Sequence, residues 1–379
     1  MAAGVKSVAL NAMFLAPGDS GGPETYLREL VRALAGEYPG LRLTVLTTRS
    51  GGAALRADGL GDAADVRSLP AEEYRRLRRQ FAEQLLVQGA ARRHRAQLLH
   101  SLASTGPVAT PGLRSVVTLH DVTFMRMPTF GRVTTWGMRH VVTRAAHDAD
   151  ALIAVSAAAR DDICATLGLN PSRFTVVPHG LGEVPRAEPA PEQPLRERLR
   201  LPGGGRLVLC VAAVRPHKNQ ELLIRALPLL PEDVVVVLAG KHEPYAEELR
   251  RLASELGVAD RLRLTGYLAD SELERLWALA ACAAFPTRAE GFGLPVLEAM
   301  ARGVPVACSD IPVLREVGGD VPRYFDSADP AAAAAAIEAL LEAGARDARG
   351  PERAGRFSWP EAARGTMEAY ERALHGRRS

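Results

Sequence analysis

The sequence predicts an α/β protein with two doubly wound parallel sheets in tandem. Short apolar runs alternate with helix-periodic segments over the first 180 residues, a proline- and glycine-rich stretch interrupts them, and the alternation then restarts. Continuously apolar runs of this length are typical of strands that are covered on both faces. In the first half we expect strands at 7–10, 43–47, 97–100, 116–120, 152–155 and 175–177, with helices near 24–35, 80–93, 132–146 and 157–167.

The second half repeats the pattern, with strands expected at 207–214, 234–238, 261–265, 282–286 and 304–308. We therefore predict a first domain at 1–180, a linker at 181–205, a second domain at 206–355 and a C-terminal helix within 356–379 that crosses back to the first domain. The linker is polar and rich in proline, which fits neither regular period. Two such domains would face a central cleft, and open α/β sheets bind ligands beyond the carboxyl ends of their strands.

Composition excludes several classes of protein. The chain has 379 residues, is 47% hydrophobic and carries a net charge of +3, so large-scale disorder is not expected. No apolar run reaches the roughly 18 residues that a membrane-spanning helix needs, and residues 1–6 lack a signal-peptide layout. We therefore expect a cytoplasmic protein. The four cysteines are widely spaced within apolar runs, which is typical of reduced thiols in a core.

One helix in the first half is rich in arginine. Residues 1–180 hold 21 basic and 15 acidic side chains, and part of this excess lies in the run from Arg75 to Arg79. Tyr74, Leu77, Phe81 and Leu85 recur beside it at helical spacing. Such a helix could rest on an anionic membrane surface, at the inner face of the membrane. The commoner arrangement buries the apolar stripe in the core and leaves the arginines in solvent. Nucleic-acid binding is not expected, because stacking aromatic residues are not interleaved with the charges.

Three loops that follow strands are candidates for the chemistry. In the first loop, Gly21 and Gly22 directly precede a predicted helix, whose free amides attract anions. The dinucleotide fingerprint G-x-G-x-x-G is absent there, which removes the main support for a nicotinamide enzyme. An ordinary flexible turn is the alternative explanation for the two glycines.

The second loop carries Arg215 and Lys218 after the first strand of the second domain. The chain has 44 arginines and only three lysines, so a lysine at this position is unusual. Two fixed cations here would suit a ligand that carries phosphate. The alternative is a surface loop with incidental charges.

The third loop, Glu290-Gly-Phe-Gly-Leu-Pro-Val-Leu-Glu298, places two acids on either side of a glycine-rich turn. Pro295 suits the first turn of a helix near 296–302, and Gly303 suits its end. The helix start can hold a phosphate, while each carboxylate can accept hydrogen bonds from a pair of hydroxyl groups. A diphosphate with a ribose on one side and a hexose on the other would use both acids. A purely structural cap remains the alternative, although a cap needs only one acid.

Together these segments resemble glycosyltransferase family 4, a family of retaining enzymes with the GT-B fold of two Rossmann-like domains. The resemblance spans nearly the whole chain. It is carried by Gly21-Gly22-x-Glu24, Thr118-Leu-His-Asp121, Val177-Pro-His-Gly180, Arg215-x-x-Lys218-Asn219, Thr265-Gly-Tyr267 and the segment from Glu290 to Glu298. His179 departs from the asparagine that is usual in the family before this glycine.

The resemblance implies a role for each matching residue. Arg215 and Lys218 would bind the diphosphate of a nucleotide sugar donor, helped by Gly21, Gly22 and the segment Gly291, Phe292, Gly293 and Leu294. Glu298 would accept hydrogen bonds from the ribose, and Glu290 would hold the transferred sugar. His120 would lie near the donor sugar and the acceptor, unless it is a structural histidine satisfied beside Asp121.

The reaction implied is transfer of a hexose or deoxyhexose to a hydroxyl of a small molecule, a glycan or a lipid-linked acceptor, without a cofactor or a metal. Asp148-Ala-Asp150 spells a metal-binding D-x-D motif, but it precedes a predicted strand and so lies at the wrong end for a site. The segment after Thr118 resembles the mannosyl- and rhamnosyltransferase branch, which implies GDP-mannose or a dTDP- or UDP-sugar. A non-catalytic sugar-nucleotide-binding protein and a sugar-nucleotide epimerase are the alternatives.

Overall fold

The interior strands of the first sheet form because apolar runs of four or six residues become strands that are covered on both faces. In the computed structural model, which describes residues 4–18, 21–71, 76–127, 132–241 and 244–376, all seven of its strands are parallel and run in the order β3-β2-β1-β4-β5-β6-β7. The order reverses between β1 and β4. The strands are β1 (Ser7–Ala12), β2 (Arg42–Thr47), β3 (Asp65–Ser68), β4 (Leu98–Ser101), β5 (Arg114–Leu119), β6 (Ala151–Ala154) and β7 (Phe174–Val176).

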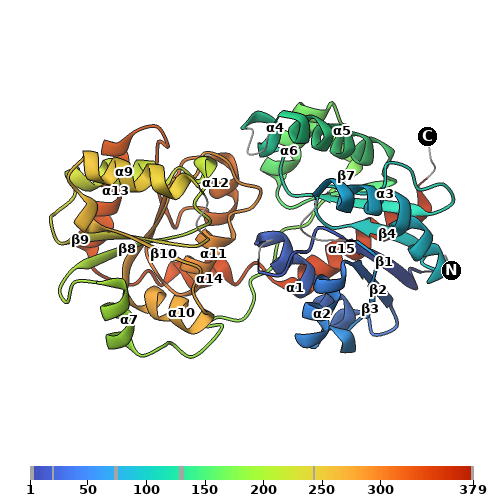
Figure 1. Ribbon diagram of the computed structural model, residues 1–379, viewed down its shortest axis with the longest axis horizontal. Coiled ribbons are helices and arrows are strands. Elements are labelled where there is room, and N and C mark those ends of the chain that lie inside the picture. Colours follow the sequence, from blue (N-terminus) through green and yellow to red (C-terminus); the bar gives the residue numbers. More distant parts are fainter. Residues whose placement is uncertain (1–3, 19–20, 72–75, 128–131, 242–243, 377–379) are drawn as a thin grey trace. The chain divides into compact units, whose positions relative to one another are not determined.

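Helices connect these strands and cover the sheet. They are α1 (Gly22–Glu37), α2 (Arg49–Ala57), α3 (Arg76–Arg93), α4 (Thr123–Arg126), α5 (Arg132–Asp148) and α6 (Ala157–Leu167). The C-terminal helix α15 (Trp359–His375) belongs to the same unit, which comprises residues 1–180 and 358–379. In Figure 1 this red helix lies among the blue and teal elements. Its side chains Trp359, Met367 and Tyr370 are buried in the core that β1, β4 and α1 form.

The second sheet contains six parallel strands in the order β10-β9-β8-β11-β12-β13 and belongs to the unit of residues 181–357. Its order reverses between β8 and β11. The strands are β8 (Arg206–Val211), β9 (Val234–Ala239), β10 (Leu262–Gly266), β11 (Ala280–Phe285), β12 (Val306–Ser309) and β13 (Arg323–Phe325). The helices are α7 (Glu192–Leu199), α8 (Gln220–Ala226), α9 (Tyr245–Glu255), α10 (Asp270–Leu279), α11 (Leu294–Ala301), α12 (Pro312–Gly318), α13 (Pro330–Ala343) and α14 (Arg349–Ala354).

Figure 1 shows α9 and α13 on one side of this sheet and α10 on the other. The two doubly wound parallel sheets that the sequence predicts are therefore confirmed. The four cysteines are free and buried, as expected. Within the described parts of the chain, no helix is long and apolar enough to cross a membrane.

The predicted linker is only partly irregular, because α7 occupies Glu192–Leu199 inside the interval 181–205. Pro194 does not prevent this helix, since it lies in the first turn, where backbone amides need no intrahelical partner. An ion pair of 2.6 Å between Glu192 and Arg196, one turn apart, supports the helix. The short edge strands β3 and β13 were not predicted, because runs of three or four residues with exposed positions carry no clear period.

Helix α3 does not bury the apolar stripe that its sequence suggests. Phe81 is 68% exposed and Leu85 is 75% exposed, while Glu83 and Val87 face the interior. The commoner arrangement, with that stripe in the core, is therefore wrong for Phe81 and Leu85. Tyr74 and Arg75 lie outside the described residues, and the side chains of 76–78 are not described either, so the predicted run of arginines is untested.

Candidate functional site

The loops after β8 and β11 meet at the carboxyl edge of the second sheet, where its strand order reverses. In doubly wound sheets this reversal is the usual place for a ligand. Asn219 joins the two loops to each other and to the segment after β13: it is fully buried, and its Nδ2 donates to the backbone oxygens of Pro286, after β11, and Ser327, after β13, at 2.9 Å each. Asn219 has a φ of 58°, a left-handed conformation that asparagine tolerates better than most residues. We had not predicted this role for Asn219.

The same loops bring Lys218 against Glu290. The Lys218 ammonium forms an ion pair with Oε1 of Glu290, and the two side chains are 19% and 16% exposed. A hydrogen bond of 2.9 Å from the amide of Arg288 to the oxygen of His217 fixes one loop on the other. Arg215 lies three residues before Lys218, at the start of the short turn Pro216–Lys218. The structure thus places Lys218, which is predicted to bind the diphosphate, beside Glu290, which is predicted to bind the sugar.

Helix α11 begins between the two predicted acids. Gly293 caps it with a φ of 98°, and a Cβ atom at this position would come within 2.6 Å of Leu314. Only glycine therefore fits this turn without displacing a neighbour. Gly291 and Phe292 precede the cap, Leu294 opens the helix, and Pro295 lies in the first turn as predicted.

Glu298 lies one turn inside α11 and is held by an arginine that we did not predict. Its side chain is 12% exposed, and its Oε1 pairs with Arg186 of the preceding linker segment. Burial raises the pKa of Glu298, and the positive charges of Arg186 and Arg302 oppose that shift. An arginine within a proline-rich stretch carries no pattern that would have revealed this contact.

In the first unit, the predicted residues also follow strands. Gly21 has a φ of 56° and precedes α1, which begins at Gly22, and a Cβ atom on either glycine would meet nothing within 4 Å. Asp19 and Ser20 of this loop lie outside the described residues. His120 directly follows β5. Its Nε2 bonds to the backbone oxygen of Leu102 at 2.7 Å, so Nε2 carries the hydrogen and Nδ1 is left as an acceptor in the neutral ring.

Burial lowers the pKa of His120, so the ring is neutral near pH 7. Asp121 does not hold this ring by a hydrogen bond: its carboxylate accepts one from the amide of Thr123 at 2.8 Å. Instead, the ring of Tyr26 meets His120 edge to face, with centroids 5.0 Å apart. His179 is also close, at 5.4 Å between ring centroids.

A buried chain of hydrogen bonds lies behind these rings. The hydroxyl of Tyr370 bonds to Nδ1 of His100 at 2.8 Å, and Nε2 of His100 bonds to Thr118 at 2.7 Å. Thr118 in turn bonds to the hydroxyl of Tyr26 at 3.1 Å. Burial lowers the pKa of His100 to about 3, which keeps it neutral. The chain ties α15, β4, β5 and α1 together, so the C-terminal helix supports the segment that positions His120.

The aspartates of the D-x-D motif have structural contacts. Asp150 accepts hydrogen bonds from Arg114 at 2.6 Å and from the amide of Ser115 at 2.9 Å. Among the residues that the structure describes, no group of three His, Cys, Asp or Glu side chains is placed to hold a metal ion.

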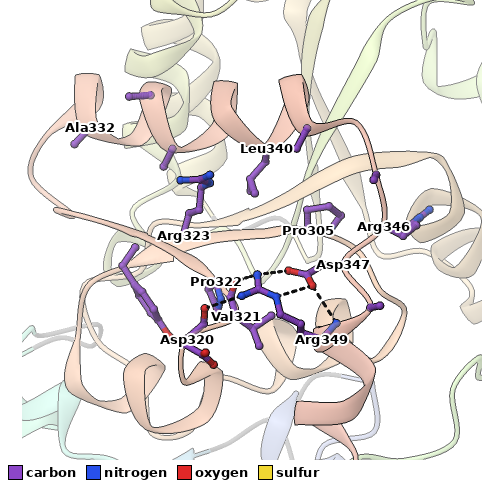
Figure 2. Close-up of a pocket in the computed structure, with 16 residues that line it drawn as sticks. Pro305, Asp320, Val321, Pro322, Arg323, Ala332, Leu340, Arg346, Asp347 and Arg349 are labelled. Carbon is purple, nitrogen blue, oxygen red and sulfur yellow. Dashed lines mark hydrogen bonds and ion pairs between the residues drawn. The ribbon is translucent and has the colours of Figure 1, made fainter.

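A wide groove of about 900 Å³ lies elsewhere in the second unit. Figure 2 shows α13 along one side of it and Arg323, Arg346 and Arg349 among its labelled residues. Pro305 and Asp320, which also line it, precede β12 and β13. The groove therefore lies at the amino ends of these strands, away from the edge where doubly wound sheets bind ligands. A smaller pocket at the carboxyl ends of β8 and β11 is lined by Lys218, Glu290 and Gly293.

Comparison with known proteins defines the class. The model described as "Glycosyltransferase Family 4" matches residues 20–181, and that described as "Glycosyl transferases group 1" matches residues 191–356. Among solved structures, Anabaena Alr3699/HepE in complex with UDP and glucose has a TM-score of 0.75 at 20% identity, covering 97% of this chain and 99% of that one. The fold is the GT-B fold of glycosyltransferases.

Relatives that are similar in sequence are also glycosyltransferases. The O-antigen chain mannosyltransferase B of Escherichia coli is 30% identical over 68% of this chain and 70% of its own length. The GDP-mannose-dependent alpha-(1-6)-phosphatidylinositol monomannoside mannosyltransferase of Mycolicibacterium smegmatis is 34% identical over 54% of this chain and 55% of its own length. The chain belongs to glycosyltransferase family 4, and it resembles the mannosyltransferases within that family.

Proposed function

We propose that this glycosyltransferase moves a hexose or deoxyhexose from a nucleotide diphosphate sugar to a hydroxyl acceptor and keeps the anomeric configuration. The pairing of Lys218 with Glu290 beside the start of α11, at the switch point of the second sheet, carries the proposal. A site with a cation, a helix start and two carboxylates suits a diphosphate flanked by two sugars.

In the proposed reaction, the acceptor oxygen forms a bond to the anomeric carbon while the bond from that carbon to the diphosphate oxygen breaks. Arg215, Lys218 and the amides near Gly293 and Leu294 stabilise the charge that grows on the leaving diphosphate. The leaving phosphate oxygen takes the acceptor proton. Glu290 positions the sugar through its hydroxyl groups and does not attack it, and Glu298 holds the ribose. His120 accepts a hydrogen bond from the sugar or the acceptor through Nδ1.

The donor is proposed as GDP-mannose or a dTDP- or UDP-sugar. The names of the two mannosyltransferases favour mannose, and one of them specifies GDP-mannose. The Anabaena structure in complex with UDP and glucose is 20% identical to this chain, so it shows the shared fold and does not decide between the donors. The acceptor, a small molecule, a glycan or a lipid-linked sugar, is proposed to bind the loops of the first unit.

A melting-temperature panel with GDP, UDP and dTDP tests the donor, because a ligand that binds the native state raises its melting temperature. Mixtures of each sugar nucleotide with candidate acceptors then test the transfer. We expect nucleoside diphosphate to be released when an acceptor is added, and we expect the same rate in EDTA. Binding without release would favour a non-catalytic binding protein, a changed sugar on an intact nucleotide would favour an epimerase, and loss of activity in EDTA would contradict a metal-free mechanism.

We also propose peripheral contact with anionic membranes through α3. The exposed Phe81 and Leu85 lie on a helix that begins with Arg76, and the sequence places Arg75 directly before it. Exposed apolar side chains beside arginines are typical of helices that lie in the membrane interface. Trp136, 73% exposed, lies on the neighbouring α5, and Gln80 of α3 contacts Met138 of α5 at 2.9 Å.

For a double Phe81→Ser, Leu85→Ser variant we expect binding to vesicles of phosphatidylglycerol and phosphatidylcholine to fall at least about tenfold, because inserting two large apolar side chains contributes more than 1.4 kcal/mol. Co-sedimentation at low salt measures the partition. Leu229→Ser is the control, because Leu229 is 56% exposed but belongs to the second unit. Equal partition of the wild type and the double variant would contradict membrane contact through this helix.

A further inference from the structure

Arg186 is the one cation that reaches Glu298 from outside its own helix in the described part of the chain. It lies in the linker segment before α7, and its guanidinium pairs with Oε1 of Glu298. Its backbone amide is fixed as well, because it donates to Glu274 at 2.9 Å. Glu274 in turn accepts hydrogen bonds from Arg302. Arg302 is the C-cap residue of α11 and lies one turn after Glu298. The arginine is thus held at both its main chain and its side chain.

Arg186, Glu274, Glu298 and Arg302 form a cluster of two positive and two negative side chains that is largely shielded from solvent. Glu274 and Arg302 are 5% and 8% exposed, and Glu298 is 12% exposed. Although burial opposes its ionisation, hydrogen bonds from Arg302 and Arg186 hold the pKa of Glu274 below its usual range. The Arg302 guanidinium therefore pairs mainly with the Glu274 carboxylate, and Arg186 is the main ion-pair partner of Glu298. A buried carboxylate without its partner becomes protonated at a higher pH.

We propose that Arg186 is a positioning residue for the sugar nucleotide: it holds the Glu298 carboxylate ionised and oriented, and leaves its second oxygen for the ribose hydroxyls. The Arg186 guanidinium contacts Oε1 of Glu298, and a carboxylate has acceptor sites on both of its oxygens. The inference rests on the proposed function, in which Glu298 holds the ribose. It extends the donor site to a linker residue that lies 112 positions before Glu298.

The charged groups around Glu298 fix the expected direction of the pH effect. Arg186 and Arg302 favour the ionised form, while Glu274 and Asp270 of α10 disfavour it. Burial already raises the pKa of Glu298, so its carboxylate is lost as the pH falls through that raised value. Removing the positive charge of Arg186 raises the pKa further. Nucleotide binding should then weaken at a higher pH than in the wild type.

The test measures the dissociation constant of GDP, UDP or dTDP, whichever binds the wild type best, between pH 5.5 and 8.5. For Arg186→Gln we expect a loss relative to the wild type that grows toward low pH and reaches about tenfold, the effect of a shift of one pKa unit. Arg186→Lys keeps the charge and should restore the wild-type profile. Arg198→Gln is the matched control, because this substitution also removes one positive charge from the second unit, but Arg198 pairs with Glu272 and not with Glu298. The nucleotide phosphate titrates in every variant, so the difference between profiles is the result.

A Glu298→Gln background separates positioning from direct contact. Without a titrating carboxyl, adding Arg186→Gln should change the affinity less than twofold at any pH. An Arg186→Gln profile that superimposes on the wild type would overturn the inference, as would an undiminished effect in the Glu298→Gln background, which would put the arginine on the nucleotide itself. If the wild type binds none of the three nucleotides, both the proposed function and this inference are contradicted. If the wild type binds a nucleotide and the Arg186→Gln profile is unchanged, only this inference is contradicted.

Discussion

Lys218→Ala should lower the rate of sugar transfer by about 10²–10³, the effect of removing one group that stabilises developing negative charge in a buried site. Two effects act in the same direction. The variant loses a cation for the leaving diphosphate, and it leaves Glu290, 16% exposed, without its ion-pair partner. A carboxylate facing a diphosphate without an intervening cation repels it. Both kcat and kcat/KM should therefore fall, measured by release of nucleoside diphosphate in the presence of acceptor.

Two comparisons make this result specific. Lys6→Ala removes one of the other two lysines at an exposed position in the first unit and should leave kcat unchanged. The double variant Lys218→Ala, Glu290→Gln removes both partners and should regain part of the nucleotide affinity, because it no longer presents an unpaired acid. A Lys218→Ala enzyme with wild-type kcat and an unchanged melting temperature would remove Lys218 from the mechanism.

A chain that ends at Phe357 should fail to fold its first unit. It lacks α15, which buries Trp359, Met367 and Tyr370 in that unit's core and closes the hydrogen-bond chain from Tyr370 to His100. Burying three side chains of this size stabilises a protein by roughly 5–9 kcal/mol, which is comparable to the whole stability of a typical domain, about 5–15 kcal/mol.

Calorimetry and limited proteolysis measure this outcome. For the truncated chain we expect protease-sensitive residues 1–180 and a stable fragment of 181–357, because the second unit is continuous in sequence. A chain that ends at Gly376 retains α15 and is the control. A truncated protein with the wild-type melting profile would show that α15 is dispensable for the first unit.

The sequence was most informative where one physical effect dominates. The four consecutive valines of β9 predict an interior strand of a parallel sheet, and in the structure β9 lies between β10 and β8 with every residue buried. The glycine-rich turn before α11 was equally readable, because only glycine tolerates a φ of 98° against Leu314. These features fixed the fold class and the place of the candidate site.

Contacts between distant segments were not readable. The pairing of Arg186 with Glu298 joins residues with no common period, and the partners His100 and Tyr370 are 270 positions apart. Helix α3 misled for a different reason: its apolar residues 81 and 85 have the right spacing for a core, but spacing alone does not say which face a helix buries. Pro194 concealed α7, because its effect depends on its position within the turn.

The discontinuous first unit also constrains biosynthesis. Its sheet is encoded in residues 1–180, but its last core element follows residue 357. During translation, the second unit is complete once residue 357 has been made, whereas the first unit still lacks its C-terminal helix at that point. Proteins built from consecutive domains usually complete the N-terminal domain first. The apolar surface that α15 covers in the first unit therefore stays exposed on the nascent chain until residues 359–375 have been made.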